Sequence, residues 1–235
     1  MSPTSNIHLL FTLAEEAKPF LAQERPSHCT VHISGVGAEN ARRAVKKIVS
    51  EHGTQVFLIL CGFCGGLGEA VTAGSLVFVE SVCEQENPDT ELNADAELEA
   101  VLTGLRPADS LCFRGKMVST RSVLITPAEK AECARRTGAI AVDMETYAAA
   151  QEAEAHCLRW IGVRAVTDGA TDTLPLDFNA FNDTNGNPDR GKIVLATLAR
   201  PHKIPALIRL GSRSAQAAKN LALFLNLLLK NLSKP

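Results

Sequence analysis

Two apolar runs of the chain each end at an acidic residue, and this arrangement most narrows the range of possible folds. Residues 141–147 have the sequence AVDMETY, with Glu145 just past the apolar part, and residues 160–168 have the sequence WIGVRAVTD, with Asp168 at the end. A short apolar run rich in β-branched residues is typical of a buried strand, and such strands deliver residues at their carboxyl ends to a common crevice. We therefore expect Glu145 and Asp168 to meet in one pocket.

Segments with strand and helix patterns alternate along the whole chain. Strands or extended segments are predicted over 7–13, 29–34, 56–61, 75–82, 111–119 and 159–167, and helices over 38–51, 95–105, 127–136, 144–155 and 191–199. The run 56–61 has no polar interruption, which indicates a strand covered by helices on both faces. With 235 residues, of which 46% are hydrophobic, the chain is expected to form one large α/β domain.

The last third of the chain contains a polar segment and an apolar tail. Residues 171–190 are rich in Thr, Asp, Asn, Gly and Pro, which predicts a long loop of the kind that often serves as a functional lid. Residues 206–229 predict a helix with more apolar positions than one stripe can hold, so it packs either on its own domain or on a partner subunit. We expect a single domain over 1–235, with a C-terminal helical extension from about residue 203.

Charge and cysteine content argue against several classes of protein. The net charge of −2 provides no basic field for nucleic acid or an anionic membrane surface. The first residues lack the positive charge of a signal peptide, and the apolar stretch 7–14 is too short to span a bilayer, so a cytoplasmic location is expected. Seven cysteines scattered through apolar segments indicate reduced thiols rather than a disulfide framework. A small, weakly charged molecule is the expected partner.

Both acidic residues have a functional and a purely structural interpretation. Glu145 begins a predicted helix, where the helix dipole favours an ionised carboxylate that could accept hydrogen bonds from two ribose hydroxyls, with Met144 as an apolar wall. Alternatively, Glu145 only caps its helix. Asp168 is expected at a crevice mouth, where burial raises the pKa of a carboxyl group toward the value that a general acid needs. Alternatively, Asp168 forms an Asx turn that closes the strand.

A glycine-rich segment with two cysteines follows the strand 56–61. Residues 62–68 have the sequence GFCGGLG, and such a loop could hold a phosphate, a water or a sugar oxygen through its backbone N–H groups. Cys61 and Cys64 form a Cys-x-x-Cys motif, which makes a thiol–disulfide redox protein a second hypothesis, although the following glycines would break the helix that such proteins need. No metal is expected, because there is no second cysteine pair and the six histidines form no ligand motif.

Taken in order, four segments resemble the purine nucleoside phosphorylase and methylthioadenosine/S-adenosylhomocysteine nucleosidase superfamily. They are SGVG at 34–37 with Asn40 and Ala41, GFCGGL at 62–67, VDME at 142–145 and RAVTD at 164–168. The resemblance extends from about residue 7 to 172. It implies a three-layer αβα fold around a mixed, partly barrel-like β-sheet, cleavage of the N-glycosidic bond of a purine nucleoside, and a homo-oligomer, a dimer or higher.

The resemblance also implies roles for individual residues. Glu145 would bind the ribose hydroxyls, Met144 would line the ribose pocket, and Asp168 would assist protonation of the purine at N7. Glu16 matches the glutamate that activates water in the nucleosidases, and it matches better than Glu15 because of its distance from the first strand.

One position departs from the pattern of the superfamily. Phe63 stands where many members have a serine that helps to hold phosphate or water, so Phe63 and Gly65 are expected to shape the substrate pocket. No cofactor is implied, and phosphate remains open as a co-substrate. Arg114 and Arg121 are candidate phosphate ligands, with ordinary surface arginines as the alternative.

The last part of the chain resembles one branch of this superfamily. DTLP at 172–175, LARP at 198–201 and IPALIRLG at 204–211 resemble the hopanoid-associated phosphorylases, which are implicated in removing adenine from adenosylhopane. Three functions remain open: an enzyme that cleaves an adenine-type nucleoside with water or phosphate, which is favoured, a thiol redox protein that uses Cys61 and Cys64, and a non-catalytic nucleoside-binding module.

Overall fold

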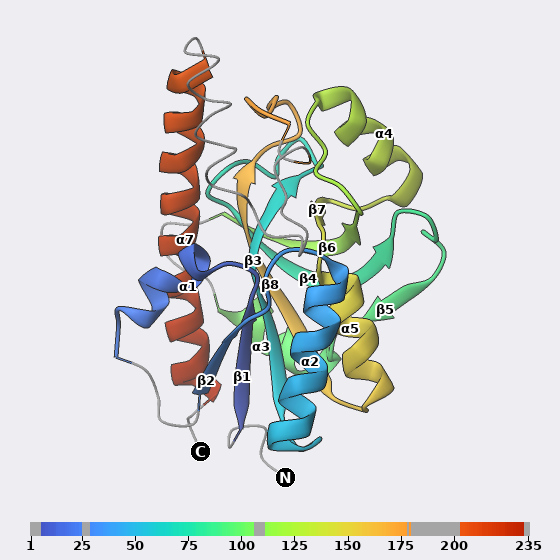
Figure 1. Ribbon diagram of the computed structural model, residues 1–235, viewed down its shortest axis with the longest axis vertical. Coiled ribbons are helices and arrows are strands. Elements are labelled where there is room, and N and C mark those ends of the chain that lie inside the picture. The colour runs from blue at the N-terminus through green and yellow to red at the C-terminus, as the bar shows by residue number, and fades with distance from the viewer. Residues whose placement is uncertain (1–5, 25–28, 106–110, 178, 180–202, 233–235) are drawn as a thin grey trace.

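The computed structural model describes residues 6–24, 29–105, 111–177, 179 and 203–232 (Figure 1). The strands are β1 (Ile7–Phe11), β2 (Cys29–Ile33), β3 (Phe57–Gly66), β4 (Leu76–Glu84), β5 (Glu91–Asn93), β6 (Cys112–Ser119), β7 (Ala141–Asp143) and β8 (Arg159–Asp168). The helices are α1 (Ala14–Leu21), α2 (Ala38–His52), α3 (Ala96–Gly104), α4 (Pro127–Thr137), α5 (Thr146–Ala155) and α7 (Ile204–Leu232). The helix predicted over 191–199 and most of the polar segment 171–190 lie outside the described residues.

The strands form one mixed sheet, part of which closes on itself. β3, β8, β4, β6 and β7 pair in a ring, because β8 pairs with both β3 and β4 while β7 pairs with both β3 and β6. β1 and β2 extend the sheet from β3 in parallel, and β5 extends it from β4. The sheet is thus partly barrel-like, as predicted.

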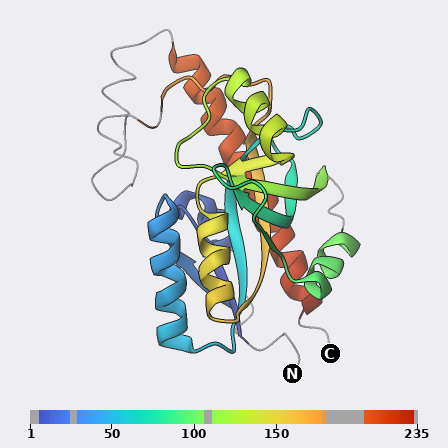
Figure 2. The ribbon, with the colours of Figure 1, turned by 90° about the vertical axis from the view of Figure 1, so that its right-hand side faces the viewer.

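Helices cover both faces of the sheet and enclose two separate apolar cores. Figure 2 shows α2 and α5 side by side on one face and α7 on the other. Along β1, Leu9 belongs to the core beneath α1 and α7, whereas Leu10 belongs to the core beneath α2 and α5. Successive side chains of a strand point to opposite faces, so the unbroken apolar runs of the sequence supply both cores. The predicted three-layer αβα architecture is confirmed.

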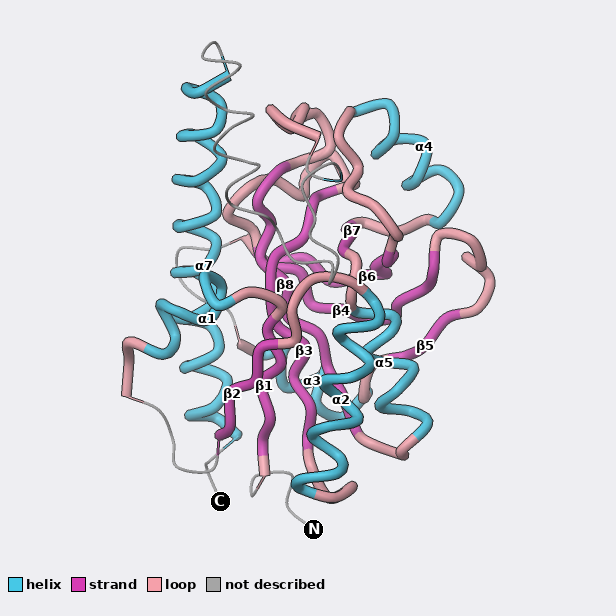
Figure 3. The backbone as a smooth tube through the Cα atoms, in the orientation of Figure 1, coloured by secondary structure: helices cyan, strands magenta, loops and turns pink. Residues whose placement is uncertain are grey.

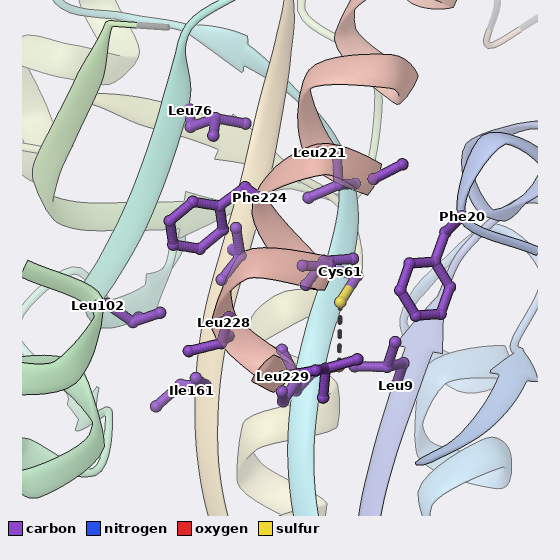
Figure 4. Close-up of a cluster of buried hydrophobic side chains, with 14 of the residues drawn as sticks. Leu9, Phe20, Cys61, Leu76, Leu102, Ile161, Leu221, Phe224, Leu228 and Leu229 are labelled. Carbon is purple, nitrogen blue, oxygen red and sulfur yellow. Dashed lines mark hydrogen bonds between the residues drawn. The ribbon is translucent and has the colours of Figure 1, made fainter. Parts of the chain in front are cut away.

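The apolar tail forms the long helix α7, which packs on its own domain. Its buried side chains, among them Leu221, Phe224 and Leu228, face β8, β3 and α1 (Figure 4). The ring of Phe224 lies 4.8 Å from that of Phe78 on β4, measured between centroids. The predicted packing of this tail on its own domain is therefore present, and packing on a partner subunit stays a prediction.

The glycine-rich segment 62–68 is not the open loop that the sequence predicted. β3 continues through it to Gly66, pairing with β8 and then with β7 (Figure 3). These glycines permit close packing: a Cβ at Gly66 would lie 2.1 Å from the carbonyl oxygen of Val71, and one at Gly62 would lie 2.5 Å from the Arg164 guanidinium. Most of the segment therefore belongs to the sheet, and its N–H groups do not form the predicted anion cradle.

Among the described residues, no helix combines the length and apolar character needed to cross a bilayer.

Candidate active site

One pocket contains the six residues that the sequence predicts for nucleoside binding and catalysis. It is a cavity of about 290 Å³ at the end of the ring of strands, lined by residues at or just past the ends of β1, β6, β7 and β8. The predicted residues that line it are Glu16, Phe63, Gly65, Met144, Glu145 and Asp168. The expectation that Glu145 and Asp168 meet in one pocket is thus met by the geometry. Their chemical roles remain predictions at this point.

Glu16 is a buried acid held by backbone N–H groups. Its Oε2 accepts hydrogen bonds from the N–H groups of Thr12 and Leu13 at 3.0 and 2.9 Å, and its Oε1 accepts one from Phe63 at 2.9 Å. Burial raises the pKa of Glu16 above its ordinary value, although these hydrogen bonds and Arg164 act in the opposite direction. A buried carboxyl group with a raised pKa is suited to accepting a proton from water.

Glu145 is equally buried, and its environment differs from the one predicted. Its Oε1 accepts a hydrogen bond of 2.6 Å from the N–H of Gly37, which links the SGVG segment to the pocket. Burial, reinforced by the nearby Asp143 carboxylate, raises the pKa of Glu145 to about 8. Burial therefore acts against the ionised carboxylate that is expected at the start of this helix, whereas the N–H contact from Gly37 and the nearby Arg164 favour it.

A buried ion pair supports this side of the pocket, and the sequence analysis assigned it no role. Arg164 on β8 forms an ion pair with Asp143, with 2.9 Å between Nη2 and Oδ2, and donates a hydrogen bond of 2.6 Å to the Thr146 hydroxyl. Asp143 also accepts a hydrogen bond of 2.6 Å from Ser119 and one from the N–H of Thr146. The pair fixes the start of α5, and hence Glu145, against the barrel. Asp143 lies in the VDME segment and Arg164 in the RAVTD segment, so two opposite charges inside apolar runs were a sequence signal for this ion pair.

Asp168 has a cation in direct contact. The Nζ atom of Lys130 lies 2.5 Å from Oδ2 of Asp168, and the Thr167 hydroxyl lies 2.7 Å from Oδ1. The two carboxylate oxygens are therefore both oriented by neighbours. The partial burial predicted for Asp168 is present, but its closest electrostatic partner is a lysine that the sequence analysis did not single out.

Lys130 reaches the pocket from α4 and is only 1% exposed. Its ammonium group also donates to the carbonyl oxygens of Gly169 at 2.7 Å and Asp172 at 3.1 Å, so all three of its N–H bonds have acceptors. Thr126 and Glu129 form a capping box that starts this helix, which sets the direction of the lysine. Within its own segment, PAEKAEC, Lys130 resembles a solvent-exposed helix residue, and no local signal distinguishes it.

Phe63 and Gly65 line the pocket without contributing a polar side chain. The Phe63 side chain is partly buried against the core that α7 covers, while its backbone holds Glu16. A Cβ at Gly65 would lie 3.3 Å from Oδ2 of Asp168, so the glycine leaves room beside this carboxylate. Met144 adds an apolar contact next to Glu145.

Much of the remaining pocket wall is apolar. Its side chains include Leu13, Val123, Leu124, Leu174 and Leu210, the last from α7. Such a wall is suited to an apolar part of a ligand, whereas the buried acids are suited to hydroxyl groups and a polarised base.

The two arginines considered as phosphate ligands lie elsewhere. Arg114 forms an ion pair of 3.1 Å with Glu80, and Arg121 forms one of 3.1 Å with Glu86, and both arginine side chains are exposed. Among the described residues that line the pocket, Lys130 is the sole cation, and its ammonium group is already occupied by three oxygen atoms.

The geometry of Cys61 and Cys64 contradicts the redox hypothesis. Both lie in β3, three residues apart, and they belong to the cores on opposite faces of the sheet. At about 3.3 Å per residue their Cα atoms are roughly 10 Å apart, beyond the ~7 Å that a disulfide allows. Burial also raises the pKa of both thiols, which disfavours the reactive thiolate.

A closed ring of strands inside an αβα sandwich, with an acid-lined pocket at its end, defines the nucleoside phosphorylase-like class of folds. The sequence agrees, since residues 25–199 match the model of the phosphorylase superfamily. The chain therefore belongs to the phosphorylase superfamily.

Solved structures share this fold at low sequence identity. One is a mutant of the 5′-methylthioadenosine/S-adenosylhomocysteine nucleosidase of Helicobacter pylori with 5′-methylthioadenosine in the active site, at 13% identity and a TM-score of 0.73 over 97% of this chain and 99% of that chain. The corresponding nucleosidase of Campylobacter jejuni has 15% identity and a TM-score of 0.72 over 97% and 99%. The futalosine hydrolase of Helicobacter pylori has 14% identity and a TM-score of 0.72 over 97% and 98%. No curated protein matches the chain.

Proposed function

We propose that this protein cleaves the N-glycosidic bond of an adenine-type purine nucleoside, with water as the nucleophile. The observation that carries the proposal is the convergence of Glu16, Glu145 and Asp168, from three separate elements, on one pocket that is otherwise largely apolar. Family membership and the fold shared with nucleosidases and a futalosine hydrolase support the same class of reaction.

Each acid has a distinct task in the proposed reaction. The bond from C1′ to N9 breaks, its electron pair moves into the base, and N7 takes up a proton through Asp168, with the Lys130 ammonium group as the proton source. Glu145 in its ionised form accepts hydrogen bonds from the ribose hydroxyls and stabilises the positive charge that develops on the sugar. Glu16 accepts the proton of the water that attacks C1′.

The electrostatics of the pocket favour water over phosphate. A phosphate dianion requires unoccupied cations or N–H groups, and the described lining residues offer only Lys130, which is already occupied. Phe63 offers no hydroxyl group to a phosphate, which also favours water as the nucleophile. A neutral water molecule next to Glu16 needs no such compensation.

The apolar wall suggests an apolar substituent at the 5′ position of the sugar. 5′-Methylthioadenosine, which the mutant Helicobacter pylori nucleosidase structure contains, carries a small group of this kind. Adenosylhopane carries a much larger one, which is the substrate class implied by the resemblance to the hopanoid-associated branch. Leu210 of α7 borders the pocket and would contact either substituent.

The test is chromatographic detection of free base after incubation of the purified protein with nucleosides. Methylthioadenosine, S-adenosylhomocysteine, adenosine, inosine and adenosylhopane are each supplied with and without phosphate. Release of adenine without phosphate is expected, and release only with phosphate would contradict the choice of water. Binding of adenosine compounds by calorimetry without any turnover would instead establish the non-catalytic binding module.

Matched variants separate chemistry from folding. Glu145→Gln is expected to lose base release while keeping the circular dichroism spectrum of the native protein. Glu154→Gln alters an exposed glutamate on the same helix, and it is expected to keep full activity. Equal activity in both variants would refute the role proposed for Glu145.

A further inference from the structure

Three histidines from three elements meet beside the part of the sheet that lies away from the pocket. They are His8 on β1, His32 on the edge strand β2 and His52, the last residue of α2 (Figures 1 and 2). One ring nitrogen from each lies within 4.8 Å of those from the other two. His8 is fully buried, whereas His52 is exposed, so an ion from solvent can approach the cluster past His52.

Hydrogen bonds present a ligand atom of the buried histidine to this cluster. Nε2 of His8 lies 2.9 Å from Oδ1 of Asn6, which is only an acceptor, so Nε2 carries the hydrogen and Nδ1 keeps its lone pair. That Nδ1 accepts a hydrogen bond from Nε2 of His32 over 2.8 Å, and a metal ion would take the place of this hydrogen. A carbonyl oxygen that orients a histidine through its second ring nitrogen is the usual partner of a metal-bound imidazole.

Two charged side chains lie beside the cluster. Among the nearby charged groups, Lys47 opposes a cation, whereas Glu51 has Oε2 4.0 Å from Nε2 of His52 and offers a carboxylate at the rim.

We propose that His8, His32 and His52 bind a divalent transition metal ion, zinc in the first instance. Three imidazoles form a ligand set common for zinc, with Zn–N distances of about 2.0–2.1 Å and a fourth position left for water or Glu51. Zinc imposes little geometric preference of its own, so small movements of the exposed His52 can complete the site.

The proposed ion has a structural task, because its ligands join the edge strand β2 and the end of α2 to β1. The edge strand β2 pairs only with β1 among the described strands, and α2 ends at His52 with a glycine directly after it. A metal bound to the native state alone raises the free energy of unfolding with the logarithm of the free metal concentration above Kd. None of the three histidines lines the pocket, so the ion takes no part in the reaction proposed above.

The experiment uses the full chain without a histidine tag, freed of metal by a chelator. Calorimetric titration with zinc is expected to show one ion per chain and a rise of several degrees in the midpoint of thermal unfolding. Cobalt is expected to give the visible absorption of a tetrahedral site with nitrogen ligands. His52→Ala and His32→Ala should weaken zinc binding at least tenfold and remove the thermal shift, and Asn6→Ala should weaken it by about tenfold.

Two variants serve as controls for other metal ligands on the surface. His156→Ala removes a partly exposed histidine outside the cluster, and Cys157→Ser removes an exposed thiol. Neither should change the affinity. The proposal is overturned if zinc at micromolar concentration does not bind, if His52→Ala and His32→Ala bind it as the native chain does, or if Cys157→Ser abolishes binding.

Discussion

The two acidic sides of the pocket compensate for burial in different ways. On one side, Glu16 and Glu145 accept hydrogen bonds from backbone N–H groups, and burial raises the pKa of both acids. Arg164 is nearby, but its ion pair is with Asp143. On the other side, Asp168 directly contacts the Lys130 ammonium group. N–H dipoles do not fully offset the loss of water around Glu16 and Glu145, whereas the charge of Asp168 is compensated by an ion pair with full hydrogen bonding. In the reaction that we propose, Glu16 accepts a proton on the first side and Asp168 delivers one on the second.

The largest expected effect tests the proton-donating side. Asp168→Asn keeps the shape of the side chain but cannot pass a proton to the base, so base release should fall by about 10²–10⁴-fold. The measurement is the steady-state rate on the preferred nucleoside, with folding checked by circular dichroism. A loss of less than tenfold would mean that protonation of the base does not depend on this side of the pocket.

Removal of the lysine tests the ion pair itself. Lys130→Met leaves Asp168 buried without its cation, which should lower the free energy of unfolding by about 3–5 kcal/mol in denaturant titrations. The double variant with Asp168→Asn should recover part of this loss, because no unpaired charge then remains. Additive losses in the two variants would show that the pair is not coupled.

The raised pKa of Glu145 predicts a specific pH dependence of stability. With a folded-state pKa of about 8 against the ordinary 4.5, the folded chain keeps a proton that the unfolded chain releases. The stabilisation is complete below about pH 4.5 and is lost as the pH rises through 8, at a rate on the order of 1 kcal/mol per pH unit. Glu145→Gln should flatten this part of the profile. If the native chain and Glu145→Gln show identical dependence of unfolding free energy on pH between 5 and 8, the raised pKa is contradicted.

The smallest expected effect concerns the apolar boundary between the two sides. Phe63→Ser introduces a hydroxyl group into the pocket, but it removes apolar contact area, so KM for a nucleoside with an apolar 5′ group should rise by roughly tenfold, corresponding to about 1.4 kcal/mol. Base release should remain independent of phosphate. If the variant becomes dependent on phosphate, Phe63 alone decides the choice of nucleophile.

The fold followed closely from local patterns in the sequence. The predicted helices 38–51 and 127–136 match α2 and α4 within one residue at each end, because apolar spacing and capping residues are local signals. The prediction of an open loop over the glycine-rich segment 62–68 was wrong, because it too was based on a local signal. Glycine there serves close approach to Val71 and Arg164, which are distant in the sequence.

The chain by itself determined which acids lie at the ends of buried strands, since strand pattern and chain position decide that directly. Only the tertiary structure decided which cation each acid meets, because Lys130 and Asp168 are separated by 38 residues and come from a helix and a strand with no shared local pattern. The same holds for His8, His32 and His52, which form no motif in the sequence. Electrostatic interaction depends on distance in space and on exclusion of water, and both are fixed only when the elements pack.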